Sequence, residues 1–157
     1  MVALKSAMSS AHDSSASGPV LLFDGGCGLC HQVVRLLLRL DRQARLRFAP
    51  LQGPAAQAYL RTHGLPTAEF DTLVYVPEWA RRDRPEFLLR TAGVIAALRA
   101  AGGVGRPLAA TLALLPAAWR DAAYRGVGRW RYRIFGAWRP RPLPRAGWAA
   151  QFLDPVP

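Results

Sequence analysis

Cys27 and Cys30 are the residues of this chain whose types and spacing best suit chemistry, and they are its only two cysteines. They follow an apolar run over residues 20–24 and the pair Gly25-Gly26, and an amphipathic pattern begins directly after them. A strand that ends in a glycine turn thus delivers two thiols to the first turn of a helix. Backbone N–H groups at a helix start are unpaired and partly positive, so they stabilise a thiolate there. We therefore predict a dithiol that can be oxidised and reduced without a further cofactor.

The two thiols are expected to have different roles, because helix geometry points them in different directions. Three polar or cationic side chains follow Cys27 on the same predicted face: His31, Arg35 and Arg39. Cys30 falls on the apolar inner face of the helix. We therefore predict that Cys27 is exposed and attacks a disulfide, and that Cys30 is sheltered and resolves the mixed disulfide. The arginines are expected to add positive charge near Cys27, and His31 is either a tuning group or an ordinary polar residue of the first turn.

Asp24 ends the predicted strand three residues before Cys27. A carboxylate in this position can relay a proton to the resolving thiol, or it can accept hydrogen bonds from the N–H groups of the turn. Both roles remain open from the sequence. Asp24, Cys27 and Cys30 are accordingly the candidate catalytic residues.

A metal or haem site is a less suitable interpretation of the two cysteines. Structural zinc needs about four ligands, and the chain adds only three histidines: His12, His31 and His63. Residues 27–31 also match the CxxCH pattern of haem attachment. Two observations argue against haem attachment: we expect no export signal, and the only methionines that could be a distal ligand are Met1 and Met8. An inert pair of buried thiols is a further alternative, and we expect no metal and no cofactor.

The order of the predicted elements indicates an α/β fold. We expect strands over residues 20–24, 45–49, 72–76 and 86–91, and helices over 28–41, 52–63 and 92–101. Short apolar or alternating runs bounded by glycine or proline predict the strands, and the spacing of apolar residues predicts the helices. The order β-α-β-α-β-β-α, with right-handed crossovers, is typical of a thioredoxin-like mixed sheet flanked by helices.

The segments on either side of this core differ from it in composition. Residues 1–18 are rich in Ser and Ala and predict a disordered leader before a dithiol core over residues 19–103. Residues 104–157 predict a basic helical extension packed on the core, with short helices broken at Pro116 and at Gly126/Gly128 and a proline-rich tail. Because the leader lacks an apolar signal core, we expect a cytoplasmic protein, in which a lone CxxC is more often chemical than structural.

The C-terminal extension carries much of the net charge of +11. Nine arginines and one acid, Asp121, lie between residues 106 and 145. Such a patch attracts nucleic acid, anionic lipid or an acidic partner, but a solvated surface biased toward arginine is the simpler interpretation. Four tryptophans among these arginines are expected to pack the helices onto the sheet: Trp119, Trp130, Trp138 and Trp148. We therefore expect no nucleic-acid partner and do not favour contact with a membrane surface.

The segment Phe23-Asp-Gly-Gly-Cys-Gly-Leu-Cys30 resembles the DxxCxxC signature of the DCC family of predicted thiol-disulfide oxidoreductases. The resemblance covers roughly residues 19–154 and includes four further segments: Arg45–Gln52, His63–Pro66, Asp71–Val76 and Arg131–Gly136. It implies a thioredoxin-like fold with a helical C-terminal extension, and it carries the family's Asp and two Cys onto Asp24, Cys27 and Cys30. The place of the cis-proline of thioredoxins is taken by Asp71, followed by Thr72, so both are candidate tuning residues.

Motif and resemblance together predict a protein-disulfide reductase. Its substrate would be a disulfide-containing protein or a small thiol compound, and an external electron donor would reduce the oxidised dithiol again. The alternative is a basic, Trp- and Arg-rich interaction or redox-sensor module at an anionic membrane surface or on a partner protein. Reduction of an insulin-type disulfide, and its loss in Cys27→Ser, distinguishes the two.

Overall fold

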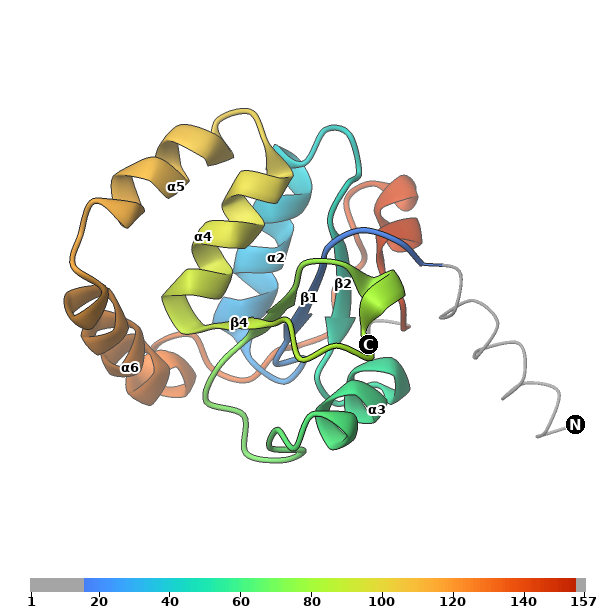
Figure 1. The fold of residues 1–157 in the computed structure, drawn as a ribbon, viewed down its shortest axis with the longest axis horizontal. Helices are drawn as coiled ribbons and strands as arrows, with labels where there is room; N and C mark the ends of the chain where they lie inside the picture. The colour runs from blue at the N-terminus through green and yellow to red at the C-terminus, as the bar shows by residue number, and fades with distance from the viewer. Residues whose placement is uncertain (1–15, 155–157) are drawn as a thin grey trace, which may run out of the picture.

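A four-stranded sheet with the order β2-β1-β3-β4 forms the centre of the computed structural model, which describes residues 16–154 (Figure 1). The strands are short: β1 (Val20–Phe23), β2 (Arg47–Pro50), β3 (Val74–Val76) and β4 (Leu88–Leu89). β1 pairs parallel with β2 and antiparallel with β3, and β3 pairs antiparallel with β4. This mixed sheet flanked by helices confirms the predicted thioredoxin-like α/β fold.

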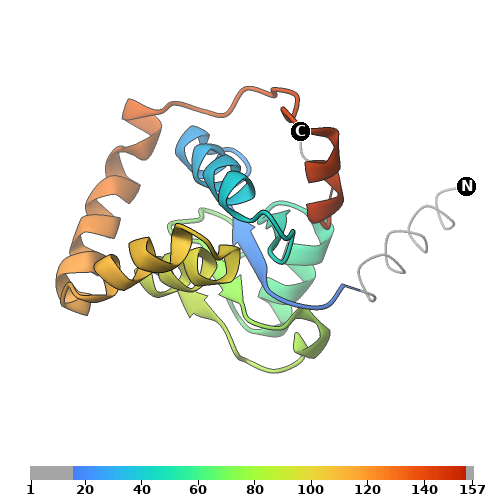
Figure 2. The ribbon, with the colours of Figure 1, turned by 90° about the horizontal axis from the view of Figure 1, so that it is seen from above.

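Five α-helices surround the sheet in the described part of the chain: α2 (Gly28–Leu40), α3 (Pro54–Thr62), α4 (Arg90–Ala101), α5 (Gly105–Ala113) and α6 (Ala117–Ile134). Two short 3-10 helices are η1 (Trp79–Arg81) and η2 (Ala146–Gln151). α2 and α4 cover one face of the sheet and α3 covers the other (Figures 1 and 2). α6 contacts both α2 and α4, which brings a distant part of the chain beside the dithiol helix.

The two faces of the sheet carry separate hydrophobic cores, because successive strand residues point to opposite sides. Leu21 and Phe23 belong to the core beneath α2 and α4. Val20 and Leu22 belong to the core beneath α3, which also contains Trp79. All four residues of β1 are buried, and burial on both faces explains the continuous apolar run. The end of β1 is therefore a rigid base for the dithiol loop that follows it.

The C-terminal helices confirm one predicted break and contradict another. α5 and α6 are separated at Pro116, as expected, but α6 runs through Gly126 and Gly128 without interruption. A glycine inside a helix costs only about 1 kcal/mol relative to alanine, so contacts made elsewhere along α6 outweigh it. The Thr91 hydroxyl at the start of α4 donates to Asp121 of α6 at 2.5 Å and so connects the two helices.

The strands are shorter than predicted, and two details have local reasons. β4 covers two residues instead of the expected 86–91. Pro50 is the last residue of β2, although the expected strand ended before it. A proline is tolerated there because β2 is an edge strand. The predicted leader falls mostly outside the described residues. Its described end contacts the fold, since Ala16 is buried in the α3 core and the Gly18 N–H donates to Glu78 at 2.6 Å.

The tail after α6 crosses the molecule on the side of α2 and reaches η2 (Figure 2). Its far end is fixed at the start of α3, where the Ala55 N–H donates to the Asp154 carboxylate at 3.1 Å. Trp148 of η2 is buried in the core beneath α2 and α4. The tail is thus held to the core at Trp148 and to the start of α3 at Asp154.

The expected packing of the tryptophans is wrong for Trp119 and Trp130, which are 71% and 52% exposed. The side of α6 that faces the core carries polar residues instead. The Tyr124 hydroxyl accepts a hydrogen bond from the Leu73 N–H at 3.1 Å, and Arg131 is buried. Because these polar groups find partners on the core, α6 packs through hydrogen bonds and leaves its tryptophans outside.

Candidate active site

Cys27 caps the N-terminus of α2, as the strand, glycine turn and helix predict. Its Sγ accepts a hydrogen bond from the Cys30 N–H at 3.3 Å. A second hydrogen bond, from the Cys30 side chain, is the largest cause of a lowered pKa, and Arg131 contributes positive charge. Against the opposing effect of burial, these lower the pKa of Cys27 from 9.0 to about 6. The Cys27 thiolate therefore predominates at neutral pH.

Cys30 is in the opposite electrostatic situation. Its thiol donates to the Cys27 sulfur, and this hydrogen bond together with burial and the nearby thiolate raises the pKa of Cys30 far above that of an ordinary thiol. The reduced pair thus holds one proton at neutral pH, and that proton lies on Cys30. The asymmetry matches a nucleophilic Cys27 and a resolving Cys30.

The expected exposure of Cys27 is wrong, because none of its surface is accessible while Cys30 is partly exposed. The cover is the segment Gly136–Trp138, which we call the strap. The Gly28 N–H donates to the Gly136 carbonyl at 3.2 Å, and the Trp138 N–H donates to the Gly26 carbonyl at 2.9 Å. These bonds place Ala137 opposite Cys27 in an antiparallel bridge. The strap comes from far along the chain, so helix geometry alone did not predict it.

Asp24 is buried and fixes the dithiol loop through both carboxylate oxygens. The Gly26 N–H and the Gln52 amide donate to Oδ1 at 2.9 and 2.7 Å. The guanidinium of Arg131 and the hydroxyl of Tyr132 donate to Oδ2 at 3.2 and 2.6 Å. The carboxylate therefore accepts a turn N–H, which is one of its two expected roles, and four donors already occupy its oxygens.

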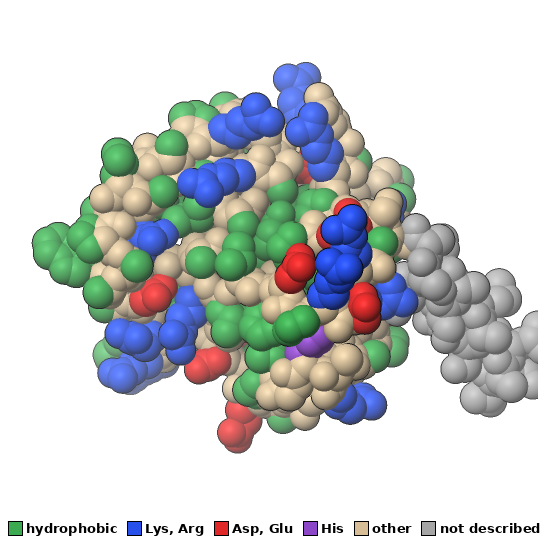
Figure 3. Space-filling view, in the orientation of Figure 1, with side chains coloured by type: hydrophobic (Ala, Val, Ile, Leu, Met, Phe, Trp, Pro, Cys, Tyr) green, Lys and Arg blue, Asp and Glu red, His purple; other side chains and the backbone are tan. Residues whose placement is uncertain are grey.

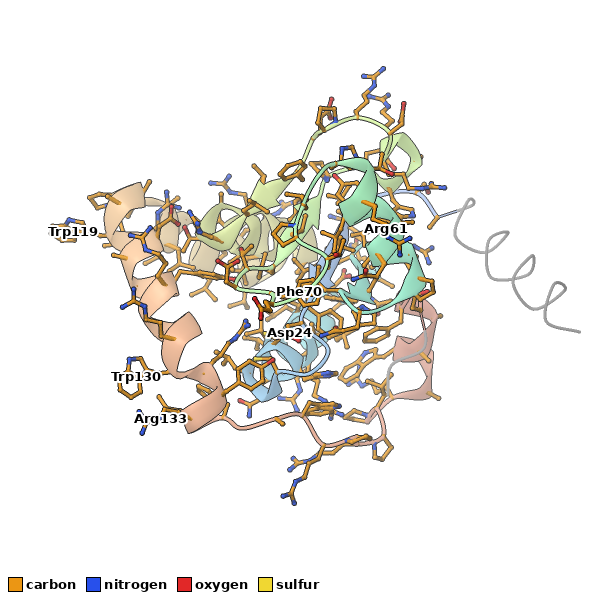
Figure 4. The ribbon with its side chains drawn as sticks, turned by 90° about the horizontal axis from the view of Figure 1, so that it is seen from below. Asp24, Arg61, Phe70, Trp119, Trp130 and Arg133 are labelled. Atoms are coloured by element: carbon orange, nitrogen blue, oxygen red, sulfur yellow. The ribbon has the colours of Figure 1, made fainter. Side chains whose placement is uncertain are left out.

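Arg131 connects α6 to the dithiol. Its guanidinium forms a buried ion pair with Asp24, donates to the Phe70 carbonyl and approaches the Cys30 sulfur at 3.8 Å. Figure 4 shows Asp24 and Phe70 close together at the centre of the molecule. Arg131 also favours the thiolate form of both cysteines. It is the cation that the site uses.

The predicted source of positive charge near Cys27 is therefore wrong for His31 and Arg35. His31 is buried, its Nε2–H donates to the Gly25 carbonyl at 2.8 Å, and its ring stacks on Trp138 at 3.9 Å between centroids. Burial lowers the pKa of His31, which favours a neutral ring. Arg35 lies over Trp138 at 5.1 Å and donates to the carbonyl of Arg141 at 3.0 Å. Both residues hold the strap and the tail.

An apolar cavity of about 120 Å³ adjoins Cys30 between the sheet, α2 and α6. Thr72 and Tyr124 line it, together with the aliphatic side chains of the surrounding core. Thr72 also accepts a hydrogen bond from the Arg90 N–H at 2.9 Å. Asp71 is exposed and does not line this cavity. Of the two candidate tuning residues at the place of the cis-proline, only Thr72 lines the cavity beside Cys30.

Three side chains that contact Asp24 have no signal in the dithiol motif: Gln52, Arg131 and Tyr132. Each is far from the cysteines along the chain, and only the fold brings them to Asp24. A signal for them exists in the resemblance, because Gln52 ends one of its segments and Arg131-Tyr132 begins another.

The described site offers thiol and hydrogen-bond chemistry. Within residues 16–154, no group of three or more His, Cys, Asp or Glu side chains is arranged to hold a metal ion. None of the helices in this part of the chain is both long and apolar enough to cross a membrane.

The ionisation of Cys27 is expected to depend on the hydrogen bond from residue 30. Absorbance at 240 nm reports thiolate whether or not the sulfur is accessible, and Cys30→Ser and Cys30→Ala each leave Cys27 as the single thiol. The serine hydroxyl can still donate and the alanine methyl cannot, so the pKa of Cys27 should be higher in Cys30→Ala than in Cys30→Ser. The wild-type transition should lie near pH 6. Equal pKa values in the two variants would contradict this cause.

Comparisons with known proteins agree with this geometry. The family model of the DCC1-like thiol-disulfide oxidoreductases matches residues 21–137. The uncharacterized protein YuxK of Bacillus subtilis (strain 168) is 30% identical over 134 residues, which cover 85% of this chain and 93% of YuxK. The chloroplastic DCC family protein At1g52590 of Arabidopsis thaliana is 30% identical over 118 residues, or 75% of this chain and 65% of the plant protein. No solved structure matches. With its DxxCxxC loop at the end of β1 and a family match over most of its length, the chain belongs to the DCC1-like thiol-disulfide oxidoreductase family.

Proposed function

We propose that the protein reduces disulfides, in proteins or in small thiol compounds, with Cys27 as the attacking and Cys30 as the resolving thiol. The observation that carries the proposal is the Cys27 thiolate at the N-cap of α2, beside a protonated Cys30 and the Arg131 guanidinium. Family membership supports the reaction class. A lone reactive CxxC is typical of a reducing compartment such as the cytoplasm, which we propose as its location.

The proposed reaction is two successive thiol–disulfide exchanges. The Cys27 thiolate attacks one sulfur of a substrate disulfide, forms a mixed disulfide and expels the other substrate sulfur as a thiolate. That thiolate takes up the proton of Cys30, and the Cys30 thiolate then attacks Cys27 Sγ. The second substrate thiolate leaves, and Cys27 and Cys30 are left as a disulfide. Arg131, 3.8 Å from the Cys30 sulfur, would stabilise the negative charge at this step. An external thiol donor supplies two electrons and restores the dithiol.

Substrate access requires the strap to move, because it covers Cys27 in the described conformation. Two backbone hydrogen bonds hold the strap to the loop, beside the contacts of Trp138 with His31 and Arg35, and each of these bonds contributes only about 1 kcal/mol net. An extended substrate segment could form the same antiparallel bonds with the loop after the strap leaves. We therefore propose local opening of the strap as the first step of the cycle.

The test is reduction of insulin by the full-length protein, with dithiothreitol as the electron donor and precipitation of the B chain as the signal. We expect catalysis above the dithiothreitol background and none with Cys27→Ser/Cys30→Ser. Oxidation of reduced ribonuclease, followed by its regained activity, measures the reverse direction. Faster ribonuclease oxidation than insulin reduction at the same enzyme concentration would overturn the reductase assignment. Absence of both activities would overturn the enzymatic proposal.

Gly28→Ala is expected to open the strap. A Cβ at this position would lie 2.8 Å from the Phe135 carbonyl oxygen and 3.2 Å from that of Gly136, and backbone atoms cannot rotate away. The strap must therefore shift outward. Alkylation of Cys27 by iodoacetamide should become about tenfold faster or more, because access limits it in the wild type. Peptide mass spectrometry after brief labelling measures this.

Gly126→Ala in α6 is the matched control, since its Cβ would meet no atom within 4 Å. It should leave the alkylation rate unchanged and stabilise the fold by about 0.5–1 kcal/mol. An unchanged rate in Gly28→Ala would show that the strap does not limit access to Cys27.

A further inference from the structure

The side of α6 that faces away from the core is apolar and exposed. Trp119, Trp130 and Ile134 are spaced by eleven and four residues, which is about three turns and one turn of helix. They therefore share one side, and their exposed fractions are 71%, 52% and 70%. Figure 4 shows Trp119 and Trp130 projecting outward from α6.

The junction between α5 and α6 continues this surface. Leu114 is 85% exposed and Leu115 is 48% exposed, directly before Pro116 and α6. Figure 3 shows hydrophobic side chains protruding at the left edge of the molecule, where these two helices meet, with arginine side chains above and below them. We call Leu114, Leu115, Trp119, Trp130 and Ile134 the α6 patch. Large exposed side chains gathered in this way are typical of an interaction surface.

Positive charge borders the α6 patch. Arg125, Arg129 and Arg133 are exposed and follow one another at intervals of four residues, so they form a row along one edge of the helix. Arg133 lies over the Trp130 ring at 5.1 Å, and Figure 4 shows both projecting outward. The acid of α6, Asp121, accepts a hydrogen bond from Thr91 of α4 and so lies against the core.

We propose that the α6 patch binds the surface of an anionic lipid bilayer. Tryptophan and leucine side chains suit the boundary between headgroups and acyl chains, and arginines along the edge would contact lipid phosphates. A net charge of +11 adds long-range attraction to such a surface. A second copy of the chain fits less well, because a symmetric contact would bring two rows of arginine together. The inference is independent of the redox activity, although the opposite side of α6 holds Asp24 through Arg131 and Tyr132.

The test is binding of the full-length protein to vesicles of phosphatidylcholine with about one third phosphatidylglycerol, measured by sedimentation. We expect binding that weakens as salt is added, and much weaker binding to pure phosphatidylcholine. A blue shift of tryptophan emission should accompany binding. Trp119→Ser/Trp130→Ser should weaken binding at least about tenfold and remove most of that shift, because these rings would leave water.

Charge variants distinguish binding through the α6 patch from attraction by the net charge of the whole protein. Arg125→Gln/Arg129→Gln/Arg133→Gln should weaken binding to the anionic vesicles about 100-fold. The matched control removes the same charge from exposed arginines elsewhere: Arg61→Gln/Arg81→Gln/Arg84→Gln. Figure 4 shows Arg61 on the α3 side, away from Trp119 and Trp130. The control should retain at least half of the wild-type binding, and melting temperatures should show that every variant is folded.

Several results would overturn the proposal. Equal loss of binding in the two triple variants would mean that net charge, not the α6 patch, attracts the vesicles. No binding to anionic vesicles would exclude a lipid surface outright. A dimer in sedimentation equilibrium that Trp119→Ser/Trp130→Ser converts to monomer would assign the patch to self-association. Binding to a DNA duplex that the patch variants weaken more than vesicle binding would assign it to nucleic acid.

Discussion

Cys30→Ser is expected to stop turnover and leave the protein joined to its substrate through Cys27. The variant keeps the thiolate at the N-cap of α2, so the first exchange can still occur. It lacks the thiol that must attack Cys27 Sγ in the second exchange. Insulin reduction should fall by about 1,000-fold or more, while a mixed disulfide accumulates that dithiothreitol cleaves. Non-reducing electrophoresis and peptide mass spectrometry detect the adduct and identify its cysteine.

Cys27→Ser is the matched control, because it keeps Cys30, which is more accessible and whose burial still opposes ionisation after the hydrogen bond to the Cys27 thiolate is lost. If accessibility decided the attacking residue, this variant would trap substrate through Cys30. If ionisation decides it, Cys27→Ser should trap almost none. A mixed disulfide mainly at Cys30 would reverse the two roles and show that substrate reaches the dithiol from the side of the apolar cavity.

The fold was predictable where local sequence patterns control it. The apolar run of β1, the glycine turn and the start of α2 form one continuous signal, and the α/β fold class follows from the alternation of strands and helices. The course of α6 was not predictable from local signals. Gly126 and Gly128 suggest a break, but the helix is held by the hydrogen bond that Tyr124 accepts from the Leu73 N–H and by the one that Arg131 donates to the Phe70 carbonyl.

The candidate site, like the fold, was predictable only where residues close together in the sequence determine it. The position of Cys27 follows from the helix start, which the sequence shows, whereas the largest cause of its lowered pKa is the hydrogen bond from the Cys30 side chain. The burial of Cys27 does not follow from the helix start, because the strap lies more than a hundred residues further along the chain. Helix periodicity also assigns apolar side chains to the core, whereas α6 turns Trp119 outward and buries Arg131. An arginine that neutralises a buried carboxylate outweighs that rule, and no periodic pattern reveals its partner.

Arg131→Met is expected to destabilise the reduced protein by about 3–5 kcal/mol, because it leaves the buried Asp24 carboxylate without its cation. The Phe70 carbonyl also loses a donor. The pKa of Cys27 should rise, since Arg131 is among the groups that lower it. Urea unfolding followed by circular dichroism measures the free energy of unfolding, and absorbance at 240 nm measures the pKa.

Arg133→Met is the control for this change, since Arg133 lies two residues further along α6, is exposed and should alter stability by no more than about 0.5 kcal/mol. A double-mutant cycle with Asp24→Asn then isolates the ion pair. Once Asp24 is neutral, Arg131→Met removes no compensation for a buried charge, so the second substitution should cost clearly less than the first. Two results would show that Arg131 does not hold the DxxCxxC loop through Asp24. One is an equal loss of stability on Arg131→Met in the wild type and in Asp24→Asn; the other is an Arg131→Met variant that is as stable as Arg133→Met.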